Sequence, residues 1–247
     1  MNPLIMIPAR MAATRLPNKP LALIGGVPMI VRAYRQAEAS GLPVAVAAGD
    51  PEIVEVIEAE GGRAILTDPD LPSGSDRIRA AVDAIDPQGD FDAVINVQGD
   101  MPFASPGLAT ACAAILHGEP ACDIATLVAA EADVSDRTNP DVVKAVLALK
   151  QNDRGEIERQ GRALYFTRST LYGDGAVWRH VGVYGYRREA LNRFCAAPQS
   201  PLEKREKLEQ LRGLELGMQI WAAVIDEAPL SIDNPTDLEA ARARSFQ

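Results

Sequence analysis

The sequence predicts a doubly wound α/β fold, in which a mostly parallel sheet is covered by helices and carries an inserted β-rich subregion. Short apolar runs alternate with helical patterns through the first part of the chain. Beyond residue 105, longer strand-like runs replace this rhythm. The chain has 247 residues, of which 47% are hydrophobic, enough for one large core. We therefore expect a single α/β domain over residues 1–247, with the subregion around 120–190.

The first part of the chain predicts four strands that alternate with three helices. The first strand runs from Leu4 to Ile7 and is expected to end at Pro8. The other strands are expected at residues 44–48, 63–67 and 92–98. The helices are expected at residues 29–40, 51–60 and 75–85. Pro51 suits the first turn of the second helix, and Ser75 is the expected cap of the third.

The second part of the chain predicts a looser arrangement. A helix is expected at residues 107–116 and a strand at 123–128. Two longer strands are expected at residues 142–150 and 180–187. The polar stretch 151–162 between them is predicted to be a hairpin or a loop.

Two further helices carry start signals. Ser200, Pro201 and Glu203 provide a cap, a first-turn proline and a capping box for a helix that extends to residue 212. Asn234 and Pro235 repeat the cap and the proline before the last helix.

The composition excludes several classes of protein. The formal net charge of −9 argues against a nucleic-acid coat or a basic membrane anchor. The three cysteines form no Cys-x-x-Cys pair, which disfavours a disulfide framework or a closed zinc site. No apolar stretch reaches the roughly 20 residues that a membrane-spanning helix needs. We expect a soluble cytoplasmic protein that binds neither nucleic acid nor membrane.

The loop after the first strand, residues 8–20, is strongly basic. Residues 1–37 contain five basic side chains and no acidic one. Two of these side chains, Arg10 and Arg15, can each form paired bonds to phosphate oxygens, and Lys19 adds a point charge. We expect the loop to be a cationic cradle for a nucleoside triphosphate, kept clear of carboxylates.

Other interpretations of this loop remain. The basic side chains can belong to a solvated loop and pair with acids elsewhere in the chain. A nicotinamide dehydrogenase or a P-loop kinase is disfavoured, because neither G-x-G-x-x-G nor G-x-x-x-x-G-K-[ST] follows the first strand.

Two aspartates follow apolar strands and are candidate metal ligands. Asp100 ends the run VINVQGD, and Asp233 immediately precedes the cap of the last helix. Mg²⁺ prefers one or two carboxylates together with phosphate and water oxygens. The alternative is a turn residue at Asp100 and a local Asx turn at Asp233.

Motifs spread along the chain resemble the sugar-nucleotide cytidylyltransferases, and among them the enzymes that act on 3-deoxy-manno-octulosonate (Kdo). The segments that carry the resemblance include PARMAATRLPNKPL, SGSDRI, NVQGDMP, LYFTR, HVGVYGYR, SPLEKREKLEQLR and IDNPTDLE. The resemblance implies a Rossmann-like fold of the nucleotide-diphospho-sugar transferase type. It also implies Mg²⁺-dependent transfer of CMP from CTP to Kdo, which gives CMP-Kdo and pyrophosphate for lipopolysaccharide biosynthesis, and it implies a homodimer.

The resemblance also implies roles for individual residues. The catalytic residues would be Lys19, Arg10, Arg15 and Asp100, and the metal ligands would be Asp100 and Asp233. The nucleotide-binding residues would be Ala9, Arg10, Arg15, Lys19 and Ser75. The residues that bind the eight-carbon acid sugar would be Arg77, Gln98, Arg168, His180, Tyr184, Glu209 and Gln210.

Two departures from the family pattern leave the sugar open. Met101 stands where the family usually has an acidic residue, and Gly49 stands where threonine is common. A modified ulosonic acid, such as an amino-substituted Kdo or a sialic-type acid, is therefore an alternative substrate. A nucleotide-binding homologue without catalytic activity is the alternative from another functional class.

Overall fold

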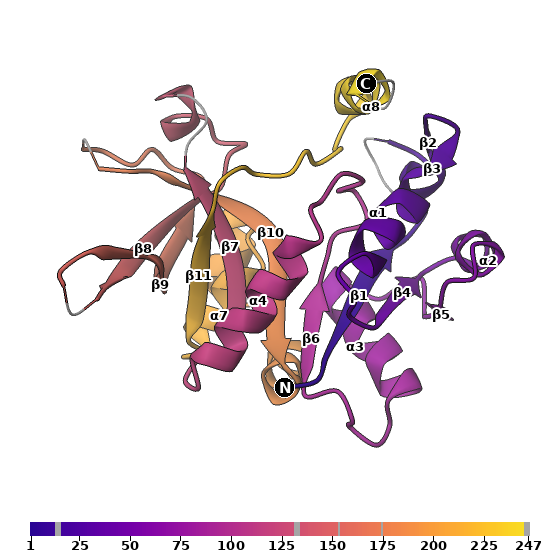
Figure 1. Cartoon of the computed structure of the whole chain (residues 1–247), viewed down its shortest axis with the longest axis horizontal. Coiled ribbons are helices and arrows are strands. Elements are labelled where there is room, and N and C mark those ends of the chain that lie inside the picture. Colours follow the sequence, from indigo (N-terminus) through magenta and orange to yellow (C-terminus); the bar gives the residue numbers. More distant parts are fainter. Residues whose placement is uncertain (13–15, 131–133, 153, 174, 245–247) are drawn as a thin grey trace. The chain divides into compact units, whose positions relative to one another are not determined.

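The computed structural model describes residues 1–12, 16–130, 134–152, 154–173 and 175–244. The chain forms two compact units, of which the first combines residues 1–110 with 229–247 and the second contains residues 111–228. The predicted β-rich subregion around 120–190 falls within the second unit. Figure 1 shows the elements of both units.

The first unit is built on a parallel sheet. Its strands are β1 (Pro3–Ala9), β4 (Val44–Ala48), β5 (Ala64–Leu66) and β6 (Ala93–Asn96). Their order in the sheet is β5-β4-β1-β6, and every adjacent pair among them is parallel. The central strands β1 and β4 are apolar along nearly their whole length, as expected for strands buried on both faces. All four strands therefore end at the same edge of this sheet.

Helices and a small hairpin complete the first unit. The helices are α1 (Met29–Glu38), α2 (Pro51–Ala59), α3 (Gly74–Ile85), α8 (Pro235–Arg244) and the 3-10 helix η1 (Lys19–Leu21). The hairpin consists of β2 (Leu23–Ile24) and β3 (Val27–Pro28). Helices α1 and α3 both pack against β1 and β4, and α2 packs against β4 and β5 (Figure 1).

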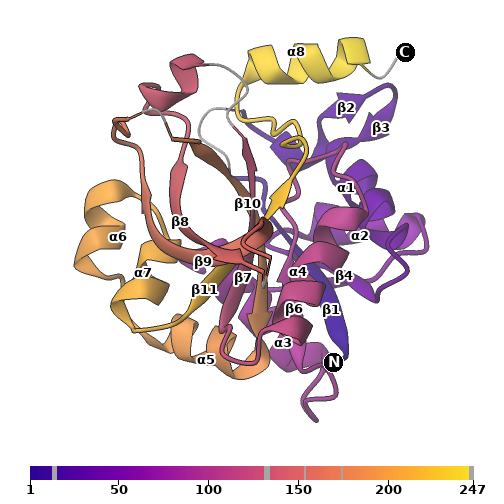
Figure 2. The same ribbon diagram turned by 60° about the vertical axis from the view of Figure 1, so that its left-hand side comes forward.

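The second unit is rich in β-structure. Its strands are β7 (Ile124–Ala130), β8 (Lys144–Gln151), β9 (Ile157–Thr167), β10 (Trp178–Arg187) and β11 (Ile220–Ile225). They follow the order β10-β7-β11-β9-β8, and a further pairing of β10 with β8 joins the two ends of that order. The helices are α5 (Arg188–Ala196), α6 (Pro201–Glu206), α7 (Gln210–Glu215) and the 3-10 helix η2 (Val134–Arg137), while α4 (Gly107–Gly118) contains the boundary between the units. Figure 2 shows the strands of this unit curling around one another.

The first strand continues past the proline that was expected to end it. Pro8 and Ala9 remain paired with Ala47 and Ala48 of β4. Proline has no amide to donate, but the amide position of Pro8 faces the β6 side, where the register with β1 stops at Met6. The proline is therefore tolerated inside the strand, and the basic loop begins two residues later than predicted.

The third helix begins before the expected cap. Ser73, not Ser75, is the cap of α3, because its Oγ accepts a hydrogen bond from the backbone N–H of Asp76 at 3.2 Å. Ser75 lies inside the helix and is fully buried.

The helix expected from residue 201 to 212 is divided into α6 and α7. The predicted capping box of Ser200 and Glu203 is confirmed. The chain then leaves the helix at Lys207, whose φ of 55° lies in the left-handed region. Within the polar stretch 151–162, Gln151 ends β8 and residues 157–162 begin β9, and the two strands pair antiparallel, so of the two expectations the hairpin is confirmed.

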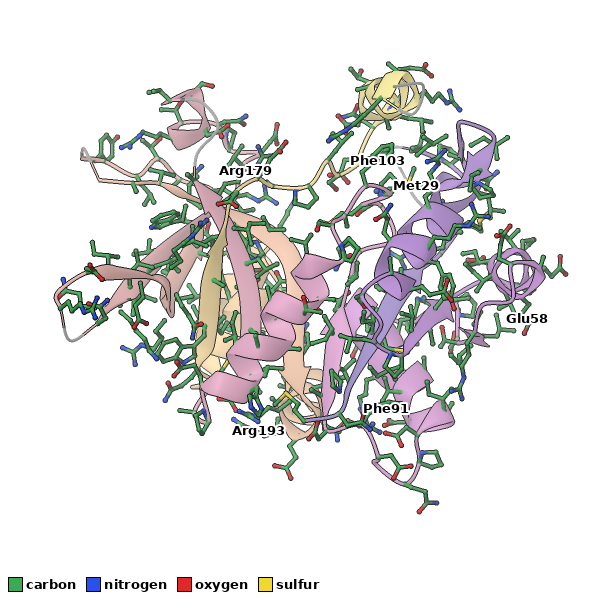
Figure 3. The ribbon with its side chains drawn as sticks, in the orientation of Figure 1. Met29, Glu58, Phe91, Phe103, Arg179 and Arg193 are labelled. Atoms are coloured by element: carbon green, nitrogen blue, oxygen red, sulfur yellow. The ribbon has the colours of Figure 1, made fainter. Side chains whose placement is uncertain are left out.

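The C-terminal segment packs against the hairpin of the first unit. Ile232, Leu238 and Ala241 form one buried cluster with Ile24 and Met29. Phe103 packs against this cluster, and Figure 3 labels it near Met29. Figure 2 shows α8 beside β2 and β3. This packing returns the end of the chain to the carboxyl edge of the parallel sheet.

None of the helices in the described ranges is long and apolar enough to cross a lipid bilayer.

Candidate nucleotide and metal site

A hollow of about 260 Å³ opens where the parallel strands of the first unit end. Loops that follow β1, β5 and β6 line it, as expected for a ligand site in an open α/β sheet. Its lining residues are Pro8, Ala9, Arg10, Ala12, Lys19, Pro20, Leu71, Ser73, Gly74, Arg77, Gln98, Gly99 and Asp100. The hollow therefore contains basic, small and acidic side chains from distant parts of the sequence.

One lysine joins both predicted metal ligands. Lys19 Nζ lies 2.6 Å from Asp100 Oδ2 and 3.3 Å from Asp233 Oδ1. The side chains of Lys19 and Asp100 are only 16% and 22% exposed, while that of Asp233 is 47% exposed. Two carboxylates thus face a single cation at a half-buried position, which leaves the cluster with a net charge of −1.

Backbone contacts hold these two carboxylates together. Ile232 N donates to Asp100 O at 3.0 Å, and this bond places the next residue, Asp233, beside the loop that follows β6. Asp237 Oδ2 accepts from the backbone N–H of Asp233 at 2.8 Å and of Asn234 at 3.1 Å. Asn234 Oδ1 in turn accepts from Asp237 N at 3.0 Å, so the predicted cap of the last helix also orients Asp233.

The carboxylate of Asp100 has an unused oxygen. Its Oδ1 is buried and has no hydrogen-bond partner among the described residues. A buried oxygen of this kind is costly unless a cation or a donor reaches it. Within the described ranges no three His, Cys, Asp or Glu side chains form a metal cluster. Two aspartates and an orphaned oxygen fit a magnesium ion whose remaining ligands are phosphate and water oxygens.

The basic loop does not stay clear of carboxylates, contrary to the expectation from the sequence. Besides the two acids at Lys19, Asp50 Oδ2 accepts a hydrogen bond from Met11 N at 2.7 Å. Asp50 follows β4 and so reaches the same edge of the sheet. Arg10 is exposed and lines the hollow, while Arg15 lies outside the described residues. The acids that hold the loop are absent from the first 37 residues but are brought to it by the fold.

Arg77 is buried at the hollow by a set of oxygen acceptors. Its guanidinium donates to Thr67 Oγ1 at 2.6 Å, to Asp68 O at 2.9 Å and to Pro69 O at 3.1 Å. Burial and the positive charge of Arg10 lower the pKa of Arg77. A Cβ atom at Gly49 would come within 2.8 Å of Nη1 of this guanidinium. The glycine therefore leaves the space that Arg77 occupies.

Two other predicted residues differ in their access to the hollow. Gln98 lines it and donates from Nε2 to Asn96 Oδ1 at 3.0 Å. Ser75, predicted to bind the nucleotide, has a fully buried side chain and is not among the lining residues. Ser73 and Gly74 line the hollow at this position instead.

Three of the predicted sugar-binding residues in the second unit, His180, Tyr184 and Glu209, lie near one another. The rings of His180 and Tyr184 lie 5.4 Å apart, and the ring of Phe166 packs edge-on against His180 at 5.0 Å. Burial lowers the pKa of His180 to about 3. Burial and the nearby charge of Glu209 raise the pKa of Tyr184. His180 and Tyr184 are therefore both neutral near physiological pH.

A buried ion pair fixes the helix that follows Glu209. Arg212 of α7 binds both carboxylate oxygens of Glu203, with distances of 2.8 and 2.6 Å. Both side chains are almost fully buried. Gln210, the other member of the predicted pair, is 4% exposed. The pair thereby positions the first turn of α7.

Arg168 lies at the end of β9 in the second unit. Its guanidinium donates to Pro140 O at 2.9 Å, and its own carbonyl accepts from the fully buried Lys144 at 2.8 Å. Lys144 also donates to Asn139 O at 2.8 Å. These bonds connect the loop before β8 with the end of β9.

The sequence interpretation missed several residues of these sites. Ser73 had a detectable signal, because Ser73 and Asp76 form the pattern of a capping box. Asp50 and Thr67 had none, because each makes its contact with a residue that is remote in sequence or on another element.

Known proteins are similar to this chain along its whole length. The sequence profile of the family described as cytidylyltransferase matches residues 4–220. A 3-deoxy-manno-octulosonate cytidylyltransferase of Paramagnetospirillum magneticum is 51% identical over 245 residues, which is 98% of this chain and 97% of the relative. The protein of that name from Parvibaculum lavamentivorans is 54% identical, over 98% of this chain and 92% of its own.

Solved structures are similar as well. A CMP:2-keto-3-deoxy-manno-octonic acid synthetase complexed with CTP has a TM-score of 0.88 and 34% identity, and the match covers 100% of this chain and 99% of the other. A 4-diphosphocytidyl-2C-methyl-D-erythritol synthase from Anaerococcus prevotii has a TM-score of 0.66 at 12% identity, over 99% and 98% of the two chains, which concerns the fold alone.

Proposed function

The chain belongs to the cytidylyltransferase family, and we propose that it transfers CMP from CTP to 3-deoxy-manno-octulosonate with release of pyrophosphate. It is a nucleotidyltransferase with the α/β fold of such enzymes. The observation that carries the proposal is the placement of Lys19, Asp100 and Asp233 at the carboxyl edge of the parallel sheet. The relatives' name and the CTP in the similar structure support the choice of substrates.

The nucleotide would occupy the hollow of the first unit. In the proposed reaction the anomeric hydroxyl of the sugar attacks the α-phosphorus of CTP, and the bond to pyrophosphate breaks. Such transfers require mainly positioning and neutralisation of charge. Arg10, Arg15 and Lys19 would neutralise the triphosphate, and Lys19 would stabilise the charge on the departing pyrophosphate. Ala9 leaves room for a phosphate close to the backbone, and Ser75 would support the loop only from inside α3.

The proposed cofactor is Mg²⁺, held by Asp100 and Asp233. When bound, the ion would supply a positive charge that polarises phosphate oxygens and increases the acidity of a nearby hydroxyl. The net charge of −1 in the cluster and the orphaned Oδ1 of Asp100 support a cation there.

The sugar would be recognised by neutral and charged groups of several elements. The proposed sugar-binding residues are Arg77, Gln98, Arg168, His180, Tyr184, Glu209 and Gln210. Of these, His180 and Tyr184 have a ring nitrogen and a hydroxyl suited to sugar hydroxyl groups, and an arginine suits the sugar carboxylate. Because Arg77 is already bound by three acceptors, Arg168 is the better candidate for the carboxylate.

We also propose a cytoplasmic homodimer whose product serves lipopolysaccharide biosynthesis. Light scattering of the purified protein should give a mass twice that of one chain. A monomeric mass at micromolar concentration would contradict the dimer.

The substrate is tested by pyrophosphate release from CTP and Mg²⁺ with a panel of acid sugars. Release with Kdo alone is the expected result. Preferential release with an amino-substituted or sialic-type acid would transfer the proposal to that sugar, and Met101 and Gly49 would be the first positions to examine. No release with any sugar, while CTP still binds, would indicate a non-catalytic nucleotide-binding protein.

A further inference from the structure

Thr126 of β7 is a fully buried hydroxyl that contacts three groups of β10. Its Oγ1 lies 3.0 Å from His180 Nε2, 2.9 Å from Val183 O and 3.3 Å from Val181 O. The sequence interpretation gave this residue no role.

An irregularity in β10 creates this arrangement. The register of β10 with β7 passes from Val181 opposite Leu127 to Tyr184 opposite Thr126. Residues 182 and 183 therefore bulge out of the ladder. The carbonyls of Val181 and Val183 turn toward the Thr126 hydroxyl, while the rings of His180 and Tyr184 remain in contact.

The contacts of the hydroxyl determine which nitrogen of His180 carries the proton. A threonine hydroxyl has one proton, and carbonyl oxygens only accept hydrogen bonds. If that proton pointed to Nε2, both carbonyl oxygens would face lone pairs of the hydroxyl oxygen without a proton between them. The hydroxyl therefore donates to the closer carbonyl, that of Val183, and accepts from Nε2–H of His180.

The other ring nitrogen is then an acceptor. His180 is neutral, because burial holds its pKa well below physiological pH. With the proton on Nε2, Nδ1 carries a lone pair. No hydrogen bond joins Nδ1 to another described residue, and His180 as a whole is half-buried rather than fully buried. The atom is thus available to a ligand.

We propose that Thr126 is a positioning residue that holds His180 as the Nε2–H tautomer, so that Nδ1 accepts a hydrogen bond from a hydroxyl of the sugar. This inference rests on the proposed function for the identity of the ligand but not for the tautomer. A site with a fixed acceptor distinguishes a sugar that carries the hydroxyl from one that lacks it, because the acceptor would remain unpaired. Thr126 therefore contributes to the choice of sugar without touching it.

The tautomer is tested directly by nitrogen NMR of the free protein. The chain contains two histidines, so labelling with ¹⁵N-histidine gives two ring systems. His117 is exposed at the end of α4, and His117→Gln leaves only the His180 signals. At about pH 7 we expect a protonated Nε2 and an unprotonated Nδ1. A protonated Nδ1, an imidazolium or averaged signals would overturn the assignment.

Two matched variants test the role of the hydroxyl. Thr126→Val keeps the shape and removes the hydroxyl, whereas Thr126→Ser keeps the hydroxyl. We expect Thr126→Val to raise the KM for Kdo roughly tenfold, the loss of one hydrogen bond, with an unchanged KM for CTP. Its His180 signals should average between tautomers, and Thr126→Ser should resemble the wild type in both measurements.

The outcomes separate this inference from the proposed function. A wild-type KM for Kdo in Thr126→Val, or an equal rise in both variants, would overturn the role of the hydroxyl. If Thr126→Val does not fold, the spectrum of the wild type still tests the tautomer of His180, and the KM of Thr126→Ser for Kdo still tests the role of the hydroxyl. If the protein accepts no acid sugar but has the Nε2–H spectrum, the proposed function and the sugar contact fail while the tautomer stands.

Discussion

Lys19 shares one positive charge between two carboxylates. Its ammonium group is 2.6 Å from Asp100 and 3.3 Å from Asp233, and the first of these contacts is the more buried. The remaining formal charge of −1 and the orphaned Oδ1 of Asp100 support the proposed binding of a cation at this position. The net charge of the site thus changes by a full unit when any one of these three side chains is neutralised.

Asp100→Asn should abolish turnover while the protein stays folded. The amide keeps the size of the side chain but removes the negative charge. The binding of Mg²⁺ and the interaction with Lys19 should therefore both become weaker. We expect a loss of at least about a hundredfold in kcat, measured by pyrophosphate release, and weaker Mg²⁺ binding by calorimetry. Asp226→Asn, an exposed carboxylate paired with Arg159 in the second unit, is the matched control. Wild-type turnover in Asp100→Asn would refute the metal assignment.

His180 should make the stability of the protein depend on pH in the acid range. Burial lowers its pKa from 6.5 to about 3 in the folded state. Between these two values the unfolded chain binds the proton and the folded chain does not, so stability falls as the pH falls from 6.5 toward 3. The contribution to the slope is at most about 1.4 kcal/mol per pH unit. Denaturant unfolding at several pH values should show a smaller slope for His180→Gln, and equal slopes would contradict the buried neutral ring.

Helices α6 and α7 illustrate what a local sequence pattern determines. Ser200 and Glu203 predicted the start of α6 correctly, because a capping box involves residues only three positions apart. The end of α6 at Lys207 was not predictable in the same way, since Leu208 is buried and Arg212 of α7 bonds back to Glu203. Tertiary contacts, which the sequence does not display, bend the chain there.

Loss of the α6 cap should cost a modest amount of stability. Ser200→Ala leaves the backbone N–H of Glu203 without its side-chain acceptor. We expect a decrease of about 1 kcal/mol in the free energy of unfolding, measured with urea. Ser200→Thr keeps a hydroxyl and should lose far less. If the alanine variant is as stable as the threonine variant, the cap contributes nothing.

Across the whole chain, the sequence predicted the helices and strands better than the contacts between residues of different elements. The alternation of apolar runs and helical patterns was sufficient to predict the parallel strands of the first unit. The charge pattern and the strand ends indicated the basic loop and the two aspartates, and the resemblance added the sugar-binding candidates. Lys19 and Asp233 are 214 positions apart in the sequence, so no local sequence pattern predicts their contact. The role of Asp50 at the basic loop was missed for the same reason, because it depends on β1 and β4 being neighbours.

Leu238→Ala should lower the stability of the first unit and weaken the binding of CTP in its hollow. Leu238 is 6% exposed in the cluster that attaches α8 to the hairpin of β2 and β3. The cavity left by the smaller side chain should cost about 2–5 kcal/mol, measured by denaturant unfolding. Because Asp233 lies just before α8, the KM for CTP should also rise. Glu239→Ala, at the adjacent and more exposed position, should change neither quantity appreciably, and equal effects in the two variants would contradict this role of the cluster.

The return of residues 229–247 to the first unit has a consequence for synthesis on the ribosome. The second unit is contiguous in the chain, so all of its strands are synthesised before the last helix. The strands of the parallel sheet are synthesised first. The contact between Lys19 and Asp233 can form only after the final segment has been synthesised. In a nascent chain stalled short of that segment, Lys19 would therefore have only one of its two acidic partners, Asp100.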